Sequence, residues 1–386
     1  MTLNYDKLKK DSIFFGLLKF AVFVFLLILI FLLFTEKITY EEKTDIQNIS
    51  EKPVDIKKDV ISKIELPPII EDAVNVKEVT SKVLLNGHKW VPQTYNDCGP
   101  ATTSMILQDF GYSVSQKDIK KTLRKNFYDR NVFLYEIQDY LKNNYDEIES
   151  KILYNGQIEK LKLLLANDFY IILEHWIHPN EDIGHFSILI GYDDEEGVFI
   201  VDDSYLGTKT KFKYKEFDDL QWKAFNRRYM PVYKKDDEKI LKKIIGEDWY
   251  ENTMHQNSIL RNKESIEKNP NDAYAWFNIG ASYYALKEYQ NSFEAFEKSE
   301  NIGWPSRMLW YQIYPVQTAN AIKNYNKALK LADIGLKNND SFVELHYEKA
   351  IAYKALSNFE SLNNELILIL KYDPNNQKAK DMLLGE

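Results

Sequence analysis

The chain has 386 residues and a formal net charge of −8, from 58 acidic and 50 basic side chains. This length predicts about two folded domains with additional segments. Hydrophobic residues make up 45% and aromatic residues 14% of the chain, which is enough material for two cores. The acidic balance argues against nucleic-acid binding, which draws on clustered Lys and Arg, so we expect no nucleic-acid partner.

Near the start of the chain lies a long apolar stretch. Residues 13–34 read IFFGLLKFAVFVFLLILIFLLF, with Lys19 as their only charge. As a helix of about 22 residues this stretch spans about 33 Å, enough to cross the hydrocarbon core of a bilayer. A cleaved signal peptide is the alternative, but the stretch is too long and no small-x-small cleavage site follows it. We therefore predict a retained single-pass anchor in the lipid bilayer.

The flanking charges predict the orientation of this anchor. Lys7, Lys9 and Lys10 precede it, whereas mainly acidic residues follow it. The positive-inside bias places residues 1–12 in the cytoplasm and the later domains outside the cell membrane. The polar residues 35–80 are predicted to be a linker. The inverted, cytoplasm-facing topology remains the alternative.

Residues 81–236 alternate between helical and strand-like patterns. Ser115 is expected to cap a helix, with Asp118 in capping-box register. Three further helices are predicted over residues 98–110, 132–145 and 158–167. A short strand over residues 151–154 is predicted before the last of these helices, and four strands are predicted after it, over residues 169–174, 185–192, 198–202 and 228–233. Helices followed by antiparallel strands predict an α+β domain.

Residues 237–386 are predicted to be almost purely helical. The segments EKNPND, LKNNDS and KYDPNN end successive helices with a period near 34 residues. Pro315 falls inside one of these helices, which it should kink or shorten. The residues Trp276, Ile279, Gly280 and Tyr283 match the W-x2-L-G-x2-Y pattern of a tetratricopeptide repeat. We therefore predict tetratricopeptide repeats, with an ordinary helical bundle as the alternative.

The single cysteine, Cys98, stands in the sequence QTYNDCGPA, so no intrachain disulfide is possible. Asp97 is predicted to cap a helix, and Pro100 suits its first turn. Cys98 then lies at the helix N-terminus, where unsatisfied N–H groups and the helix dipole favour a thiolate. Gly99 would let a substrate approach the backbone. Gln93 is a candidate amide donor to an oxyanion beside the Cys98 N–H.

A cysteine nucleophile needs a base, and the base needs an orienting carboxylate. Among six histidines, His185 has the best setting, because it opens the strand HFSILIGY, which turns through DDEEG and returns as VFIVDD. In an antiparallel hairpin His185 meets Asp202 and Asp203 at the far ends of the two strands. Neighbouring strand residues face opposite sides, so only one aspartate shares the His185 face, and the register leaves both candidates open.

The other histidines carry weaker predictions. His175 and His178 in HWIHPNED allow a metal site as a less favoured alternative, whereas His88, His255 and His346 are expected to be structural. The sequence contains no P-loop, dinucleotide-binding glycine pattern or CxxC pair. We therefore predict no metal and no cofactor.

Two segments, PQTYNDCGPATTSMILQDFGYSVSQKDI and GHFSILIGYDDEEGVFIVDDSYLG, resemble the family-39 cysteine peptidases, the double-glycine leader peptidases of papain-like fold. QWKAFNRRYMPVYKKDDEKILKKIIGEDW and GWPSRMLWYQIYP are similar to the bacterial subset in which tetratricopeptide repeats follow that domain. The resemblance covers about residues 83–386. It implies that Cys98 is the nucleophile, His185 the base and Gln93 the oxyanion residue, and that the acid is Asp203, which stands in an Asp-Ser-Tyr context.

The full transporters of that family add a six-helix membrane domain and an ATPase, and neither is found in this sequence, so we expect a stand-alone enzyme. The prediction is a membrane-anchored bacterial cysteine peptidase that hydrolyses peptide bonds in a peptide or protein substrate. Its repeats are expected to bind the substrate or a protein partner. An amidase or acyl-transfer enzyme with the same triad, and a catalytically silent peptide-binding module, are the alternatives.

Overall fold

The computed structural model describes residues 74–124, 128, 131–337 and 339–384. These residues belong to one compact unit, residues 71–386. The predicted cytoplasmic N-terminus, the membrane anchor and most of the linker lie outside the described residues. Within the described ranges, no helix has the length and apolar character that crossing a membrane requires.

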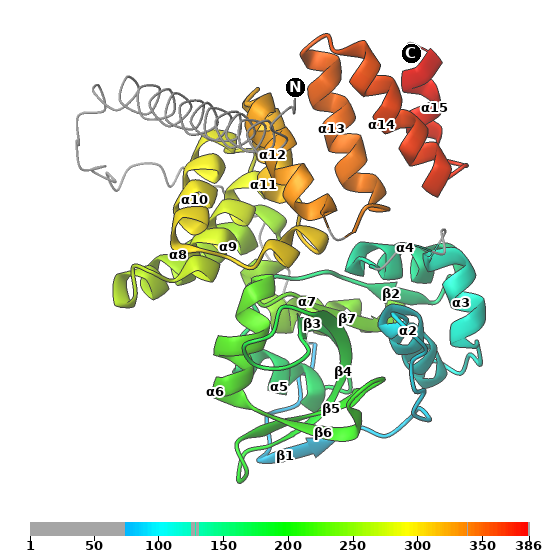
Figure 1. Cartoon of the computed structure of the whole chain (residues 1–386). Coiled ribbons are helices and arrows are strands. Elements are labelled where there is room, and N and C mark those ends of the chain that lie inside the picture. Colours follow the sequence, from blue (N-terminus) through cyan, green and yellow to red (C-terminus); the bar gives the residue numbers. More distant parts are fainter. Residues whose placement is uncertain (1–73, 125–127, 129–130, 338, 385–386) are drawn as a thin grey trace, which may run out of the picture. The chain divides into compact units, whose positions relative to one another are not determined.

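The first part of the described chain is built around an antiparallel sheet (Figure 1). The strand order is β2-β7-β3-β4-β5-β6, and β1 pairs with β4. The strands are β1 (Lys82–Leu84), β2 (Ile148–Ser150), β3 (Tyr170–Trp176), β4 (Gly184–Asp193), β5 (Val198–Asp203), β6 (Gly207–Lys213) and β7 (Tyr229–Lys234).

Most strands lie where the sequence predicted them, but three differ. The prediction of a strand over residues 151–154 was wrong, because pairing with β7 ends at Ser150 and only Leu153 forms an isolated bridge beyond it. Strands β1 and β6 were not predicted. β1 has only three residues, and β6 carries four Thr or Lys residues in the run TKTK, so neither shows a clear apolar alternation.

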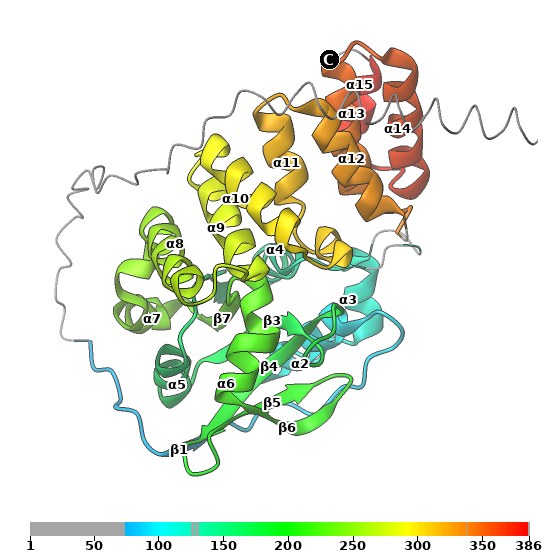
Figure 2. The ribbon, with the colours of Figure 1, turned by 60° about the vertical axis from the view of Figure 1, so that its left-hand side comes forward.

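Helices cover both faces of this sheet (Figures 1 and 2). Alternate strand residues point to opposite faces, so Ile172 and Ile188 enter one core and Leu173 and Leu189 the other. The first core is shared with α2 (Cys98–Asp109), α3 (Gln116–Leu123) and α4 (Leu134–Asn144), and the second with α5 (Ile158–Ala166) and α7 (Glu238–Ile245). The short helix α6 (Tyr214–Glu216) follows β6.

The second part of the described chain, which we call the helical region, runs from α8 to α15. Its helices are α8 (Glu251–Lys268), α9 (Ala273–Ala285), α10 (Tyr289–Ile302), α11 (Tyr314–Ala321), α12 (Tyr325–Leu336), α13 (Val343–Ala355), α14 (Phe359–Tyr372) and α15 (Gln377–Leu384). A mixed α/β sheet domain followed by a helical region agrees with these two parts of the predicted fold class, whereas the predicted transmembrane helix lies outside the described residues.

Within the helical region, successive helices pair in a regular manner. Gly280 of α9 is needed because an added Cβ would lie 2.8 Å from the Phe296 ring on α10. The turns inside three helix pairs each place a residue at positive φ, at Lys287, Lys323 and Ser357, a spacing close to the predicted repeat. Pro315 shortens a helix, as one of the two predicted outcomes, and does not kink it. Helix α11 begins at Tyr314, which places the proline in its first turn, and it has 8 residues where α9 and α13 have 13.

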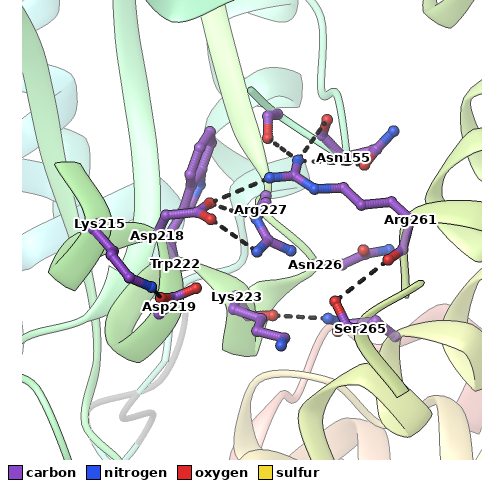
Figure 3. A network of polar contacts seen from close by, with 12 residues as sticks. Asn155, Lys215, Asp218, Asp219, Trp222, Lys223, Asn226, Arg227, Arg261 and Ser265 are labelled. Carbon is purple, nitrogen blue, oxygen red and sulfur yellow. Dashed lines mark hydrogen bonds and ion pairs between the residues drawn. The ribbon is translucent and has the colours of Figure 1, made fainter. Parts of the chain in front are cut away.

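Polar contacts fasten the helical region to the sheet domain (Figure 3). Arg261 on α8 donates to the carbonyl oxygen of Gly156 at 2.5 Å and lies 3.6 Å from the Asp218 carboxylate. Asp218 also accepts two hydrogen bonds from Arg227, at 2.5 and 2.9 Å. Because these groups are largely withdrawn from water, the two parts share a specific junction rather than a loose tether.

Candidate active site

Cys98 is the first residue of α2, as the sequence predicted, and its side chain is half-buried. The predicted capping role of Asp97 is wrong, however. Asp97 occupies the N-cap position without a side-chain capping bond. Its carboxylate instead binds Lys120 at 2.8 Å and Arg124 at 2.5 Å, both contributed by the α3 segment. These two cations outcompete the backbone N–H groups and tie the start of α2 to α3.

Gly99 packs closely against a neighbouring segment, and its role in the approach of a substrate stays a prediction. The residue is buried, and an added Cβ would lie 2.9 Å from the Val132 side chain. That separation is shorter than carbon atoms tolerate, so a larger residue would displace the chain around Val132. The glycine therefore lets that segment pack closely beside the cysteine.

His185 lies at the start of β4, where its ring reaches two of the predicted partners. Its Nε2 atom is 2.9 Å from Asp203 Oδ1, and its ring is also hydrogen-bonded to the Cys98 side chain. Burial lowers the pKa of His185, but the hydrogen bonds to Asp203 and Cys98 outweigh it and raise the pKa to about 10. The imidazolium form of His185 is thus favoured beside the sulfur.

Asp203 is fully buried behind His185. The strand register pairs Asp203 with Ser187. Because Ser187 lies two residues after His185 in β4, the side chains of Asp203 and His185 lie on the same face of the sheet. Oδ1 of Asp203 accepts hydrogen bonds from the N–H groups of Tyr205 and Leu206, each at 2.7 Å, and Oδ2 accepts from the Ser187 hydroxyl at 2.5 Å. Burial raises the pKa of Asp203, but these bonds and His185 lower it well below its ordinary value.

Asp202, the second candidate acid, faces the opposite side of the sheet. Its Oδ2 lies 3.0 Å from Nε2 of His88, whose Nδ1 is 2.7 Å from Asp109 on α2. Asp202 is therefore part of a separate histidine–carboxylate cluster. The expectation that His88 is structural agrees with this position.

Gln93 lies in the loop before α2 with its side-chain orientation held by Ser204. The Ser204 hydroxyl donates to Gln93 Oε1 at 2.8 Å, and the Gln93 N–H donates to the Ser204 carbonyl oxygen at 2.9 Å. Because the amide oxygen accepts from Ser204, the amide NH2 group is the end left to donate. The first-turn N–H of Cys98 is a second donor nearby, since N-terminal N–H groups of a helix have no intrahelical partner.

Gln93, Cys98 and His185 line one cleft of about 610 Å³. The sheet domain contributes most of its walls, and the helical region adds Arg307, Trp310 and Tyr311. The structure therefore brings together the four predicted site residues, three at the surface of the cleft and Asp203 buried behind His185. A nucleophile, a base with its carboxylate and two oxyanion donors are the components of acyl-transfer chemistry.

Comparison with known proteins shows a resemblance of the region around this site to one family. Residues 84–231 match the model of the Peptidase_C39 like family. The matched range contains all four predicted site residues and confirms the resemblance to family-39 cysteine peptidases over this part of the chain. No curated protein sequence matches the chain significantly.

Solved structures also align with parts of the chain. The peptidase domain of Streptococcus ComA, a bi-functional ABC transporter, is 18% identical over 38% of this chain and 97% of its own, with a TM-score of 0.28. A double glycine motif protease from an AMS/PCAT transporter, solved in complex with the leader peptide, is 16% identical over 40% of this chain and 96% of its own, with a TM-score of 0.27. YrrB, a TPR protein with an unusual peptide-binding site, is 13% identical over 32% of this chain and 63% of its own, with a TM-score of 0.30.

The C39-like region also holds polar residues that the sequence did not single out for the site. Ser187 links Asp203 to His175, whose Nε2 lies 2.7 Å from the Ser187 hydroxyl oxygen. His175 turns its Nδ1 toward the carbonyl oxygen of Trp176 at 2.7 Å. Among the described residues no group of three potential metal ligands is found. The strand alternation could have placed Ser187 on the His185 face, but no local signal identifies Ser204 or His175.

Proposed function

We propose that this protein is a membrane-anchored cysteine peptidase in which Cys98, His185 and Asp203 form the catalytic triad. The observation that carries the proposal is the continuous chain of contacts from the Cys98 thiol through the His185 ring to the Asp203 carboxylate, opening into a cleft beside Gln93. The match of this region to a peptidase family supports peptide bonds as the substrate.

The mechanism follows from the atoms in place. Because Nε2 of His185 is held by Asp203, Nδ1 is the atom that exchanges a proton with the thiol. The Cys98 thiolate attacks the peptide carbonyl, and the Gln93 amide and the Cys98 N–H stabilise the oxyanion. His185 then protonates the leaving amine, and water releases the acyl group from sulfur. Asp203 fixes the imidazole orientation and stabilises its cation.

The first test measures the thiolate directly in the full-length chain in detergent. Cys98 is the only cysteine, so iodoacetamide incorporation reports on it alone. We expect fast labelling at pH 5 to 6 in the wild type. In a His185→Ala variant we expect labelling at pH 6 to fall by about 100-fold, because an unpaired thiol titrates near pH ~8.5. Wild-type labelling that begins only above pH 8 would mean that Cys98 is structural.

The same preparation separates peptidolysis from its alternatives. Hydrolysis of a peptide with no trace of an added amine in the product supports a peptidase, whereas incorporation of added glycinamide indicates acyl transfer. A Gln93→Ala variant should keep its labelling rate but lose about 100-fold in turnover, because only the oxyanion donor is removed. A Cys98→Ala variant that retains full cellular function would favour the silent binding module.

We further propose that residues 13–34 anchor the enzyme in the cell membrane with its folded part outside the cytoplasm. The apolar stretch and the preceding lysines support this topology. Externally added protease should degrade the folded part in intact cells, and protection of that part would instead indicate the inverted topology. The helical region is proposed to bind the substrate or a protein partner, as solenoid surfaces commonly do.

A further inference from the structure

The helical region supplies one wall of the active-site cleft. Arg307, Trp310 and Tyr311 follow α10 in the chain and line the same cleft as Cys98 and His185. The site on the C39-like region is therefore bounded by residues that lie outside it in sequence. The question is whether this wall only encloses the cleft or also contacts the substrate.

This wall is held in place from both sides. The Arg307 guanidinium donates to Asp182 at 2.6 Å, and Asn131 donates through its side chain to the carbonyl oxygen of Trp310. On its other side, the Trp310 indole N–H donates to the carbonyl oxygen of Gly335 in α12 at 2.8 Å. Contacts with the sheet domain and with the helical region together give the wall a defined position relative to the nucleophile.

Tyr311 lies against the start of β4, the strand that carries His185. Its ring packs edge-on against Trp176 and Phe225, with ring centroids 5.6 and 5.8 Å apart. A Cβ added to Gly184 would lie only 2.6 Å from the Tyr311 ring. Glycine at this position therefore lets the ring lie directly against the backbone that precedes His185.

The ring carbon that carries the Tyr311 hydroxyl lies 2.8 Å from the place of an added Gly184 Cβ, in the wall of the cleft that also holds Cys98 and His185. Burial raises the pKa of Tyr311, a hydrogen bond from the Gly184 backbone lowers it, and negative charge on Cys98 raises it. A hydrogen bond that lowers the pKa of Tyr311 stabilises the phenolate oxygen, so the Gly184 N–H is the donor and the Tyr311 oxygen is the acceptor. The hydroxyl thus accepts from Gly184 and keeps its own proton for donation.

We propose that Tyr311 is a substrate-binding residue of the peptidase site, and that its hydroxyl donates a hydrogen bond to a backbone carbonyl of the peptide lying across Cys98. This inference rests on the proposed function, because it requires a peptide in the cleft. Every residue of a peptide carries a backbone carbonyl, so the contact holds the chain without selecting a side chain. The helical region then completes the binding site as well as presenting a surface to partners.

The test compares Tyr311→Phe with Tyr314→Phe in the full-length chain in detergent. The first variant removes the hydroxyl and keeps the ring. The matched control removes a hydroxyl from the same junction, where Tyr314 lies 3.4 Å from the Tyr154 hydroxyl, away from the residues that line the cleft. Iodoacetamide labelling of Cys98 at pH 6 is measured alone and with acetyl-tripeptide aldehydes ending in Gly, Leu, Lys or Glu, which add reversibly to a thiolate.

Labelling without aldehyde should be equal in the three proteins, because neither change touches the thiol–imidazole pair. The aldehyde concentration that halves labelling should rise roughly three- to tenfold in Tyr311→Phe only, as expected for the loss of one hydrogen bond. Gly184→Ala, whose new methyl group would push the ring away, should give a rise in the same direction.

Three results would overturn the inference and leave the peptidase proposal standing. These are equal protection of wild type and Tyr311→Phe, an equal rise in the Tyr314→Phe control, and a fast-labelling wild type that none of the aldehydes protects. A wild type that labels only above pH 8 would instead defeat the proposed function, and the inference with it. The labelling step therefore separates failure of the enzyme from failure of the Tyr311 contact.

Discussion

Strand β5 ends in two consecutive aspartates, and each binds a histidine on its own face of the sheet. Asp203 Oδ1 lies 2.9 Å from Nε2 of His185, and Asp202 Oδ2 lies 3.0 Å from Nε2 of His88. Hydrogen bonds to carboxylates raise the pKa of both histidines against the effect of burial, that of His185 to about 10 with help from Cys98 and that of His88 to about 9. Neither the pairing nor the direction of the pKa shift distinguishes the two clusters.

The difference lies in what the far side of each ring meets. His88 meets a second carboxylate, Asp109, so its cation is clamped between two anions. The ring of His185 meets the Cys98 thiol in an open cleft. A histidine–aspartate pair is thus equally suited to holding a fold together and to activating a nucleophile, and the third group decides between these roles.

The largest effect should come from exchanging the two aspartates for asparagine, one at a time. Asp203→Asn removes the negative charge that stabilises the His185 cation, so turnover of a peptide cleaved by the wild type should fall by about 100-fold or more. Asp202→Asn should leave turnover per folded molecule within about threefold, since its partner His88 does not reach the cleft. Equal losses in the two variants would remove the functional distinction between the clusters.

Removing His88 should damage stability instead of chemistry. In His88→Gln, Asp109 and Asp202 face each other without a cation between them, so the free energy of unfolding should fall by about 3 kcal/mol. The midpoint of urea unfolding, followed by circular dichroism, measures this loss. Iodoacetamide labelling of Cys98 at pH 6 in the folded variant is the control and should equal that of the wild type. A slower labelling rate would show that the two clusters are coupled.

The contribution of His88 should also depend on pH in a defined direction. Its folded-state pKa is raised to about 9, above the value of about 6.5 for a histidine in an unfolded chain. The stability it adds is therefore fully present below pH 6.5 and is lost as the pH rises through 9. The difference in unfolding free energy between wild type and His88→Gln should shrink by on the order of 2 kcal/mol from pH 6.5 to 10. A constant difference would mean that His88 is uncharged in the folded protein.

Much of the candidate site could be predicted from the sequence because its parts are local. The NDCGP segment predicts a helix beginning at the cysteine, and the HFSILIGY and VFIVDD strands predict a hairpin that joins a histidine to an aspartate. Strand alternation limits the acid to one aspartate of two, but the choice depends on pairing Asp203 with Ser187. That register follows from the packing of the whole sheet and from the bulge between Leu189 and Gly191.

The errors and omissions involve partners that are distant in sequence. Asp97 was predicted to cap its own helix, but two cations from the next helix bind it more strongly. Tyr311 reaches the cleft only because the helical region docks against Trp176 and Phe225. Such contacts depend on tertiary packing, for which helix and turn signals carry no information.

The smallest expected effect tests the hydroxyl groups that support the two aspartates. Ser187 donates to Asp203 at 2.5 Å, and Thr208 donates to Asp202 at 2.7 Å, so Ser187→Ala and Thr208→Ala form a matched pair. Asp203 keeps His185 and two backbone donors, so Ser187→Ala should lower peptide turnover only about three- to tenfold. Thr208→Ala should leave it unchanged. A similar loss in both variants would mean that the hydroxyls act through the stability of β5. Support of the carboxylate would then not distinguish the proposed catalytic cluster of His185 and Asp203 from the cluster of His88 and Asp202.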